Sequence, residues 1–156
     1  MRAVALLKAR GMTFAAAESC TGGLIAKRIT DIAGASAVFR GGVVSYTNGV
    51  KAEVLGVPQD LLDAYGAVSV PVARSMAENV RRLTRADLGV SVTGIAGPDT
   101  DERGNPVGTV FIALADGRET DVRQLSLGTG RERVRQASAD CVFEMIFSYL
   151  EEQTPI

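Results

Sequence analysis

Histidine is absent from the 156 residues of this sequence. Histidine is the usual general base at neutral pH, because its ordinary pKa already lies close to 7. Its absence excludes Ser-His-Asp and Cys-His catalytic arrangements, and it excludes zinc sites that depend on imidazole ligands. Any hydrolysis by this chain would therefore need a lysine, a tyrosine or a carboxylate as the base.

Cysteine and long apolar runs are scarce as well. Cys20 and Cys141 are the only thiols, which argues against a disulfide scaffold or a cysteine-rich zinc site and favours a reducing compartment. No apolar run is long enough to cross a bilayer. The opening residues, MRAVALLKARG, resemble an amphipathic helix more than a signal peptide. We therefore expect a cytoplasmic protein with no membrane partner and no metal site.

An excess of positive charge is also missing. The 17 basic and 18 acidic side chains give a formal net charge of −1. Binding to nucleic acid depends on neutralising phosphates, so we expect no nucleic-acid partner. With 46% hydrophobic and 22% charged residues, the composition is that of an ordinary globular protein, and the length predicts one domain over residues 1–156.

The hydrophobic pattern predicts alternating helices and strands, followed by two adjacent strands. Six helices are expected, over residues 2–10, 19–30, 47–55, 58–66, 70–85 and 130–151. Ser19 is the expected cap of the second, Thr47-Asn48 of the third and Ser69 of the fifth, and Pro58 is expected in the first turn of the fourth. The expected strands cover residues 13–17, 38–46 with a bulge or close approach at Gly41-Gly42, 88–92, 107–115 and 122–127. This order predicts a mixed sheet covered by helices on both faces.

Two long helices have predicted core stripes. At helical spacing, the stripe of the helix over 70–85 consists of Val72, Met76, Val80 and Leu83. The stripe of the last helix consists of Val134, Ala137, Cys141, Met145 and Tyr149. These faces are expected to pack on the sheet.

The segment Glu18-Ser19-Cys20-Thr21-Gly22-Gly23 lies where a predicted strand is followed by a helix. Ligands in open α/β sheets bind at the carboxyl ends of strands, and helix-start amides can hold an anion or a developing oxyanion. Two glycines in a first helical turn cost about 1 kcal/mol each relative to alanine, which fits a close approach to a ligand. Alternatively, Ser19 is an N-cap and the glycines permit tight packing; spacing alone favours this second interpretation.

Lys51 is the best candidate for a base. If Asn48 caps the helix, Lys51 falls in its first turn, where the helix dipole disfavours the ammonium form. Lowering its pKa from about 10.4 to near 7.5 takes roughly 4 kcal/mol, most of which burial must supply. Tyr46 could orient the amine or donate a hydrogen bond to it. Sequence alone favours a solvated surface lysine and a tyrosine that simply packs.

Two other groups of residues offer alternatives. Cys20 is a rival nucleophile, since a thiol at a helix start can have a depressed pKa, although most cysteines are buried packing residues. Arg131, Arg133 and Arg135 crowd the start of the last helix and could meet a phosphate. A solvated face is the simpler interpretation, because alternate residues do not share one side of a helix.

Several ordered motifs resemble the CinA carboxy-terminal domain family, and together they span nearly the whole chain. They are AAAESCTGGL at 15–24, GAS at 34–36, FRGGVVSYTN at 39–48, Lys51, VTGIAGP at 92–98 and PVGTV at 106–110. The resemblance implies a three-layer α/β/α fold with a mixed, mostly parallel sheet. It also implies the stand-alone form, since longer relatives carry an additional amino-terminal domain.

The activity implied by the resemblance is the hydrolysis of nicotinamide mononucleotide to nicotinate mononucleotide and ammonia. It assigns Ser19 and Lys51 to catalysis, needs no cofactor or metal, and makes a homo-oligomer the expected state. Tyr46 is a third candidate catalytic residue, because it could orient the amine. The candidate substrate-binding residues are Cys20, Thr21, Gly22, Gly23, Asn48, Gly94, Ala96 and Gly97. Asn105 stands where relatives often have a lysine, in the loop DTDERGN at 99–105. The alternative function is a non-catalytic module that binds or senses pyridine nucleotides.

Overall fold

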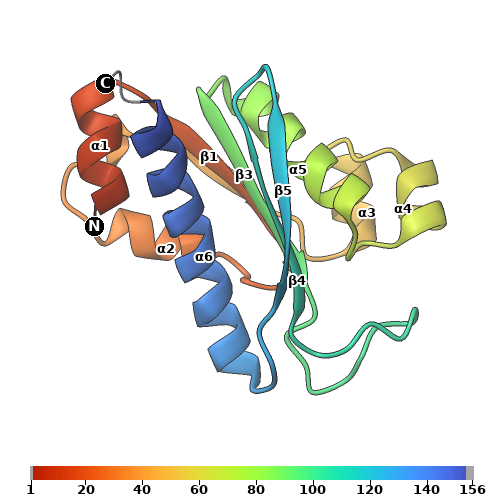
Figure 1. Ribbon diagram of the computed structural model, residues 1–156. Coiled ribbons are helices and arrows are strands. Elements are labelled where there is room, and N and C mark those ends of the chain that lie inside the picture. Colours follow the sequence, from red (N-terminus) through yellow and green to blue (C-terminus); the bar gives the residue numbers. More distant parts are fainter. Residues whose placement is uncertain (1, 154–156) are drawn as a thin grey trace.

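A five-stranded sheet forms the centre of the computed structural model, which describes residues 2–153 (Figure 1). The strands lie in the order β2-β1-β3-β4-β5. β1 pairs in parallel with β2 and β3, whereas β4 runs antiparallel to β3 and β5. The strand bounds are β1 Phe14–Glu18, β2 Phe39–Val44, β3 Leu88–Gly94, β4 Thr109–Ala115 and β5 Thr120–Ser126. The expected mixed sheet is confirmed, with β4 as the one strand of opposite direction.

Helices cover both faces of the sheet. On one face lie α1 Arg2–Arg10, α2 Leu24–Thr30 and α6 Arg131–Glu152; on the other lie α3 Asn48–Glu53, α4 Gln59–Tyr65 and α5 Val70–Thr84 (Figure 1). A 3₁₀ turn, η1, spans Ala35–Ala37. The central strand β1 alternates between the two cores: Phe14 and Ala16 pack on the α6 side, and Ala15 and Ala17 on the α5 side. The three-layer α/β/α fold is therefore confirmed.

Glycine and alanine bring β1 and β2 close together. The pairing steps from Phe14 opposite Phe39 to Ala15 opposite Gly41, so the strand bulges there. A Cβ atom on Gly42 would lie 2.6 Å from the carbonyl oxygen of Ala16. Both the bulge and the close approach expected at Gly41-Gly42 are present.

Two of the predicted helix starts, those of α2 and α4, are wrong in detail, and the cap expected at Thr47-Asn48 is confirmed. α2 begins at Leu24 with Gly23 at its cap position (φ 99°), and no side-chain cap bond is made there, so Ser19 is not its N-cap. Thr47, whose hydroxyl accepts from the Val50 amide, caps α3, and Asn48 is the first helical residue. Pro58 occupies the cap position of α4 instead of its first turn. Gly23, Thr47 and Pro58 each have the non-helical backbone conformation of a cap position.

The predicted core stripes are partly wrong. Leu83 lies in the last turn of α5 and is 58% exposed. On α6, Ala137, Cys141 and Tyr149 are only half-buried. The buried face consists of Val134, Ser138, Ala139, Val142, Phe143, Met145, Ile146 and Leu150. This face is wider than a single stripe because α6 packs on the sheet and on α1 and α2.

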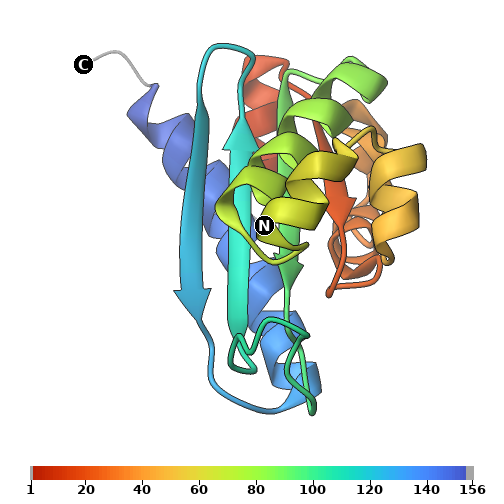
Figure 2. The same ribbon diagram turned by 90° about the vertical axis from the view of Figure 1, so that its right-hand side faces the viewer.

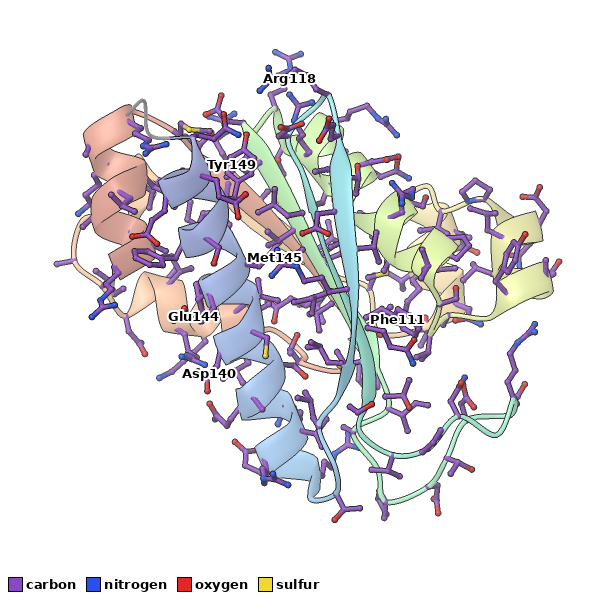
Figure 3. The ribbon with its side chains drawn as sticks, viewed as in Figure 1. Phe111, Arg118, Asp140, Glu144, Met145 and Tyr149 are labelled. Atoms are coloured by element: carbon purple, nitrogen blue, oxygen red, sulfur yellow. The ribbon has the colours of Figure 1, made fainter. Side chains whose placement is uncertain are left out.

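The two ends of α6 are attached to different parts of the sheet. Near its carboxyl end, the Tyr149 hydroxyl donates to Asp116 at 3.1 Å in the β4–β5 hairpin (Figure 3). Its first turn lies at the same end of the molecule as the β3–β4 loop (Figure 2). That end is also where β1 passes into α2. Among residues 2–153, no helix is long and apolar enough to span a membrane.

Candidate active site

Glu18 fixes the turn that follows β1. Its carboxylate is buried and accepts hydrogen bonds from the Thr21 hydroxyl at 2.7 Å and from the amides of Ile25 at 2.8 Å and Ala26 at 3.1 Å. A negative charge at the start of α2 satisfies amides that have no partner within the helix. The cap function expected of Ser19 is thus carried by Glu18, which leaves the Ser19 side chain available.

Ser19 and Lys51 are in direct contact. Lys51 Nζ lies 2.8 Å from Ser19 Oγ and 2.7 Å from the carbonyl oxygen of Ser45. Lys51 is 1% exposed and Ser19 is 7% exposed. The amide of Ser19 donates to the Val92 carbonyl at 3.0 Å, so the backbone of the serine is held by β3.

Ser45 connects the backbone next to Ser19 with the amine of Lys51. Its amide and its hydroxyl both donate to the carbonyl oxygen of Glu18, at 2.7 and 3.2 Å. Its own carbonyl accepts from Lys51. The serine and the lysine are therefore both positioned from the end of β1. The carbonyl of Ser45 holds the amine, whereas Tyr46, expected to orient it, bonds elsewhere.

Burial lowers the pKa of Lys51 from 10.5 to about 8, and the neighbouring Cys20 thiol acts more weakly in the opposite direction. At pH 7, about a tenth of the side chain is then a neutral amine, compared with roughly 0.03% at the ordinary pKa. A neutral amine has a lone pair that can accept the Ser19 proton. The contact has the composition and geometry of a Ser-Lys nucleophile and base.

Cys20 has the opposite electrostatic setting. Burial raises the pKa of its thiol to about 11, against weaker lowering effects that include Lys51 and Arg135. A thiol with this pKa is almost entirely protonated at pH 7, and the thiolate is the nucleophilic form. The depressed pKa considered from the sequence is therefore not found, and the structure favours Ser19.

A cavity of about 450 Å³ opens beside the pair. Eight of the predicted site residues line it: Ser19, Cys20, Tyr46, Asn48, Lys51, Gly94, Ala96 and Gly97. Three do not: Thr21 is fully buried with its hydroxyl on Glu18, and Gly22 and Gly23 lie on the turn outside the lining. The Gly22 amide donates to the Ser19 carbonyl at 3.0 Å, so it is committed to the turn.

Arg131 completes the lining, and its place there is not evident from the sequence. Its guanidinium donates to the Gly97 carbonyl at 2.6 Å and to the Tyr46 hydroxyl at 3.0 Å. Arg135, by contrast, donates to the carbonyls of Cys20 and Thr21 and supports the turn. Sequence distance hid both contacts, since α6 meets the β1–α2 turn only in the folded chain.

Ala67, Val68 and Thr93 also line the cavity without having been predicted to do so, as do residues 98–101 of the β3–β4 loop. Arg103 attaches this loop to α4 through the carbonyls of Asp63 and Ala64. The Asp101 carboxylate is occupied by the Arg103 amide and by Asn105, which donates from its amide and its side chain. Asn105 therefore braces the loop.

Two further features of the molecule are a second hollow and the arrangement of its carboxylate and thiol side chains. A larger hollow of about 640 Å³ lies between β5 and the carboxyl end of α6, near Tyr149 and Arg118 (Figure 3), and shares no lining residue with the Ser19 cavity. No serine, cysteine or lysine lines it, and its Tyr149 and Thr120 hydroxyls donate to the carboxylates of Asp116 and Glu78. Within residues 2–153, no group of three or more carboxylate or thiol side chains is arranged to hold a metal ion.

The family model of the CinA C-terminal domain matches residues 1–150. The chain belongs to the CinA family. A CinA-like protein of Syntrophus aciditrophicus is 53% identical over 147 residues, which cover 94% of this chain and 35% of that protein. The chain spans about a third of the length of the curated relatives it matches.

Solved CinA structures share the fold over their whole length. The competence/damage inducible protein CihA of Agrobacterium tumefaciens is 39% identical, with a TM-score of 0.91 and coverage of 96% of this chain and 92% of that one. The competence damage-inducible protein A of Klebsiella pneumoniae is 29% identical, with a TM-score of 0.95 and coverage of 98% and 95%. These names describe CinA proteins without stating a reaction.

Proposed function

We propose that this chain is an amidohydrolase that converts nicotinamide mononucleotide and water to nicotinate mononucleotide and ammonia. The observation that carries the proposal is the buried contact of 2.8 Å between Lys51 Nζ and Ser19 Oγ beside an open cavity. A lysine deprived of water and without a carboxylate partner is costly to bury, and such a cost is typical of catalytic sites. The cavity volume of about 450 Å³ lies within the range of small-molecule sites, about 300–1,000 Å³.

In the first half of the proposed reaction, neutral Lys51 takes the proton of Ser19 while Oγ attacks the carboxamide carbon. The carbonyl oxygen becomes an oxyanion that needs backbone donors. The Ser19 and Gly22 amides already donate to Val92 and Ser19. The amide of Cys20, which directly follows the nucleophile in a residue that lines the cavity, is the candidate donor.

In the second half, protonated Lys51 gives its proton to the departing nitrogen, and ammonia leaves. The product is an ester between the nicotinoyl carbon and Ser19 Oγ. Water then attacks this ester with Lys51 again acting as the base, and Ser19 Oγ recovers its proton as nicotinate is released. One amide bond is broken and one water is consumed. No redox partner or metal is required.

The test is ammonia release from nicotinamide mononucleotide by the purified protein, with Ser19→Ala and Lys51→Met as variants. We expect each substitution to reduce turnover by about 1,000-fold or more, because nucleophile and base act as a unit. Circular dichroism verifies that the variants are folded. Full activity of Ser19→Ala would refute the scheme.

The non-catalytic alternative gives a different outcome in the same experiment. Saturable binding of the nucleotide by calorimetry, without ammonia release by the unmodified chain, would support a binding module in place of an enzyme. In that case Ser19→Ala would bind the nucleotide as the unmodified chain does.

A further inference from the structure

Arg131 is a cation at the cavity whose charge is not neutralised by the protein. Its two hydrogen-bond partners, the Gly97 carbonyl and the Tyr46 hydroxyl, are both neutral. Among the described residues, no carboxylate lies within ion-pair distance of its guanidinium. Two carboxylates line the cavity. Asp101 is occupied within its own loop, and Asp99 is exposed and forms no ion pair with Arg131. A free positive charge therefore faces the space next to Ser19.

The three groups in this contact come from three segments around the cavity. Tyr46 follows β2, Gly97 lies in the β3–β4 loop, and Arg131 is the first residue of α6. Arg131 and Tyr46 are both exposed, whereas Gly97 is buried. The guanidinium nitrogen on Tyr46 can therefore turn toward a ligand while the other nitrogen keeps its bond to the Gly97 carbonyl. A guanidinium presents paired N–H donors that match the oxygens of a phosphate.

We infer that Arg131 binds the 5′-phosphate of the nucleotide and makes the site specific for the phosphorylated substrate over the corresponding nucleoside. This inference rests on the proposed function. Ser19 and Arg131 line the same cavity, so a substrate whose carboxamide lies at Ser19 has its phosphate on the Arg131 side, where the guanidinium exchanges the Tyr46 hydroxyl for phosphate oxygens. Lys51, the other cation of the cavity, is occupied with Ser19 and Ser45.

The neighbouring arginines provide a contrast. Arg135 pairs with Glu132 at 3.3 Å and supports the turn after β1. Arg133 donates only to the Thr129 carbonyl at 3.4 Å and does not line the cavity. Arg133→Gln therefore removes one positive charge from the same helix end without touching the site, and it is the matched control.

The experiment compares kcat/KM for nicotinamide mononucleotide and nicotinamide riboside in the unmodified chain, Arg131→Gln, Arg131→Lys and Arg133→Gln. For Arg131→Gln we expect a loss of about 10- to 100-fold on the mononucleotide, the value of hydrogen bonds to a charged group, and less than about threefold on the riboside. Arg131→Lys keeps the charge but loses the paired donors, so its kcat/KM on the mononucleotide is expected to lie between those of the unmodified chain and Arg131→Gln. Arg133→Gln leaves both substrates unchanged.

Two outcomes would overturn the inference separately from the proposed function. Equal losses on both substrates in Arg131→Gln would show that Arg131 only braces Gly97 and Tyr46. If the unmodified chain hydrolyses neither compound, the proposed function fails. Calorimetry with the same two compounds then tests the role of Arg131 by itself. Binding of the mononucleotide but not the riboside, lost in Arg131→Gln, supports the inference. Equal binding of both compounds, or no binding of the mononucleotide, refutes it.

Discussion

Lys51 Nζ contacts Ser19 Oγ at 2.8 Å although 32 residues separate them in the sequence. The contact exists because Ser45, six residues before the lysine, is hydrogen-bonded to the Glu18 carbonyl, one residue before the serine. The parallel pairing of β1 and β2 brings Glu18 opposite Val44 and so determines where both side chains emerge. The pair is a consequence of strand register, and the chemistry follows from its burial.

The first prediction concerns the pH dependence of hydrolysis. Because burial lowers the pKa of Lys51 to about 8, the neutral amine increases about tenfold per pH unit below 8 and saturates above it. We expect kcat/KM for the mononucleotide to follow the same curve between pH 6.5 and 9.5, with a midpoint near 8. A midpoint near 10, or a rate that is independent of pH, would contradict Lys51 as the base.

The second prediction concerns stability. The pKa of Lys51 is about 8 in the folded chain and 10.5 as its ordinary value. Between these values the unfolded chain holds more protons, so the penalty of burying the ammonium is complete below pH 8 and is lost as the pH rises to 10.5. That penalty is roughly 3 kcal/mol. The unfolding free energy of Lys51→Met minus that of the unmodified chain should therefore fall by about 3 kcal/mol between pH 7 and pH 10.5.

Urea unfolding at the two pH values measures this difference, since titrating groups that do not interact with Lys51 cancel between variant and parent. The control is Lys27→Met, which replaces a lysine whose side chain is 69% exposed and paired with Asp31 on the surface. Its stability difference should change by less than about 0.5 kcal/mol over the same range. A flat difference for Lys51→Met would mean that the buried amine does not titrate near 8.

The third prediction concerns Cys20, the rival nucleophile. Burial raises the pKa of its thiol to about 11, so at pH 7 the thiolate fraction is about 100-fold below that of an ordinary cysteine. In a Cys141→Ser variant, where Cys20 is the only thiol, iodoacetamide should modify the folded protein at least about 100-fold more slowly than a free thiol. Mass spectrometry follows the modification. Rapid alkylation at pH 7 would restore Cys20 as a candidate.

The sequence was sufficient for most of the fold. Alternating apolar residues or short apolar runs located every strand, and the adjacency predicted for the last two strands is confirmed by the pairing of β4 with β5. Such signals are local, since strand periodicity and turn residues act over a few positions. The errors occurred where a side chain acts across the fold: Glu18 caps α2 seven residues away, and this removed the need for Ser19 to do so.

The candidate site was only partly predictable, for the same reason. Motifs after β1 and β2 indicated Ser19 and Lys51, because residues at the carboxyl ends of parallel strands converge. The contribution of Arg131 depends on α6 crossing to the far end of the sheet, and its contact with Tyr46 joins residues 85 positions apart. The burial that lowers the pKa of Lys51 likewise depends on how elements distant in sequence pack around it. Neither can be inferred from spacing along the chain.

The last prediction tests the strand register on which the Ser-Lys contact depends. Gly42→Ala would place its Cβ 2.6 Å from the backbone carbonyl of Ala16, so β1 and β2 must separate, and we expect a loss of about 1–3 kcal/mol of unfolding free energy. Gly49→Ala is the matched control, because its nearest neighbour is Thr47 Oγ1 at 3.9 Å and its position is helical. That change should be neutral or stabilising by up to about 1 kcal/mol. If the register positions the pair, Gly42→Ala also slows hydrolysis while Gly49→Ala does not; equal stability and equal rates for the two variants would show that the close approach is unimportant.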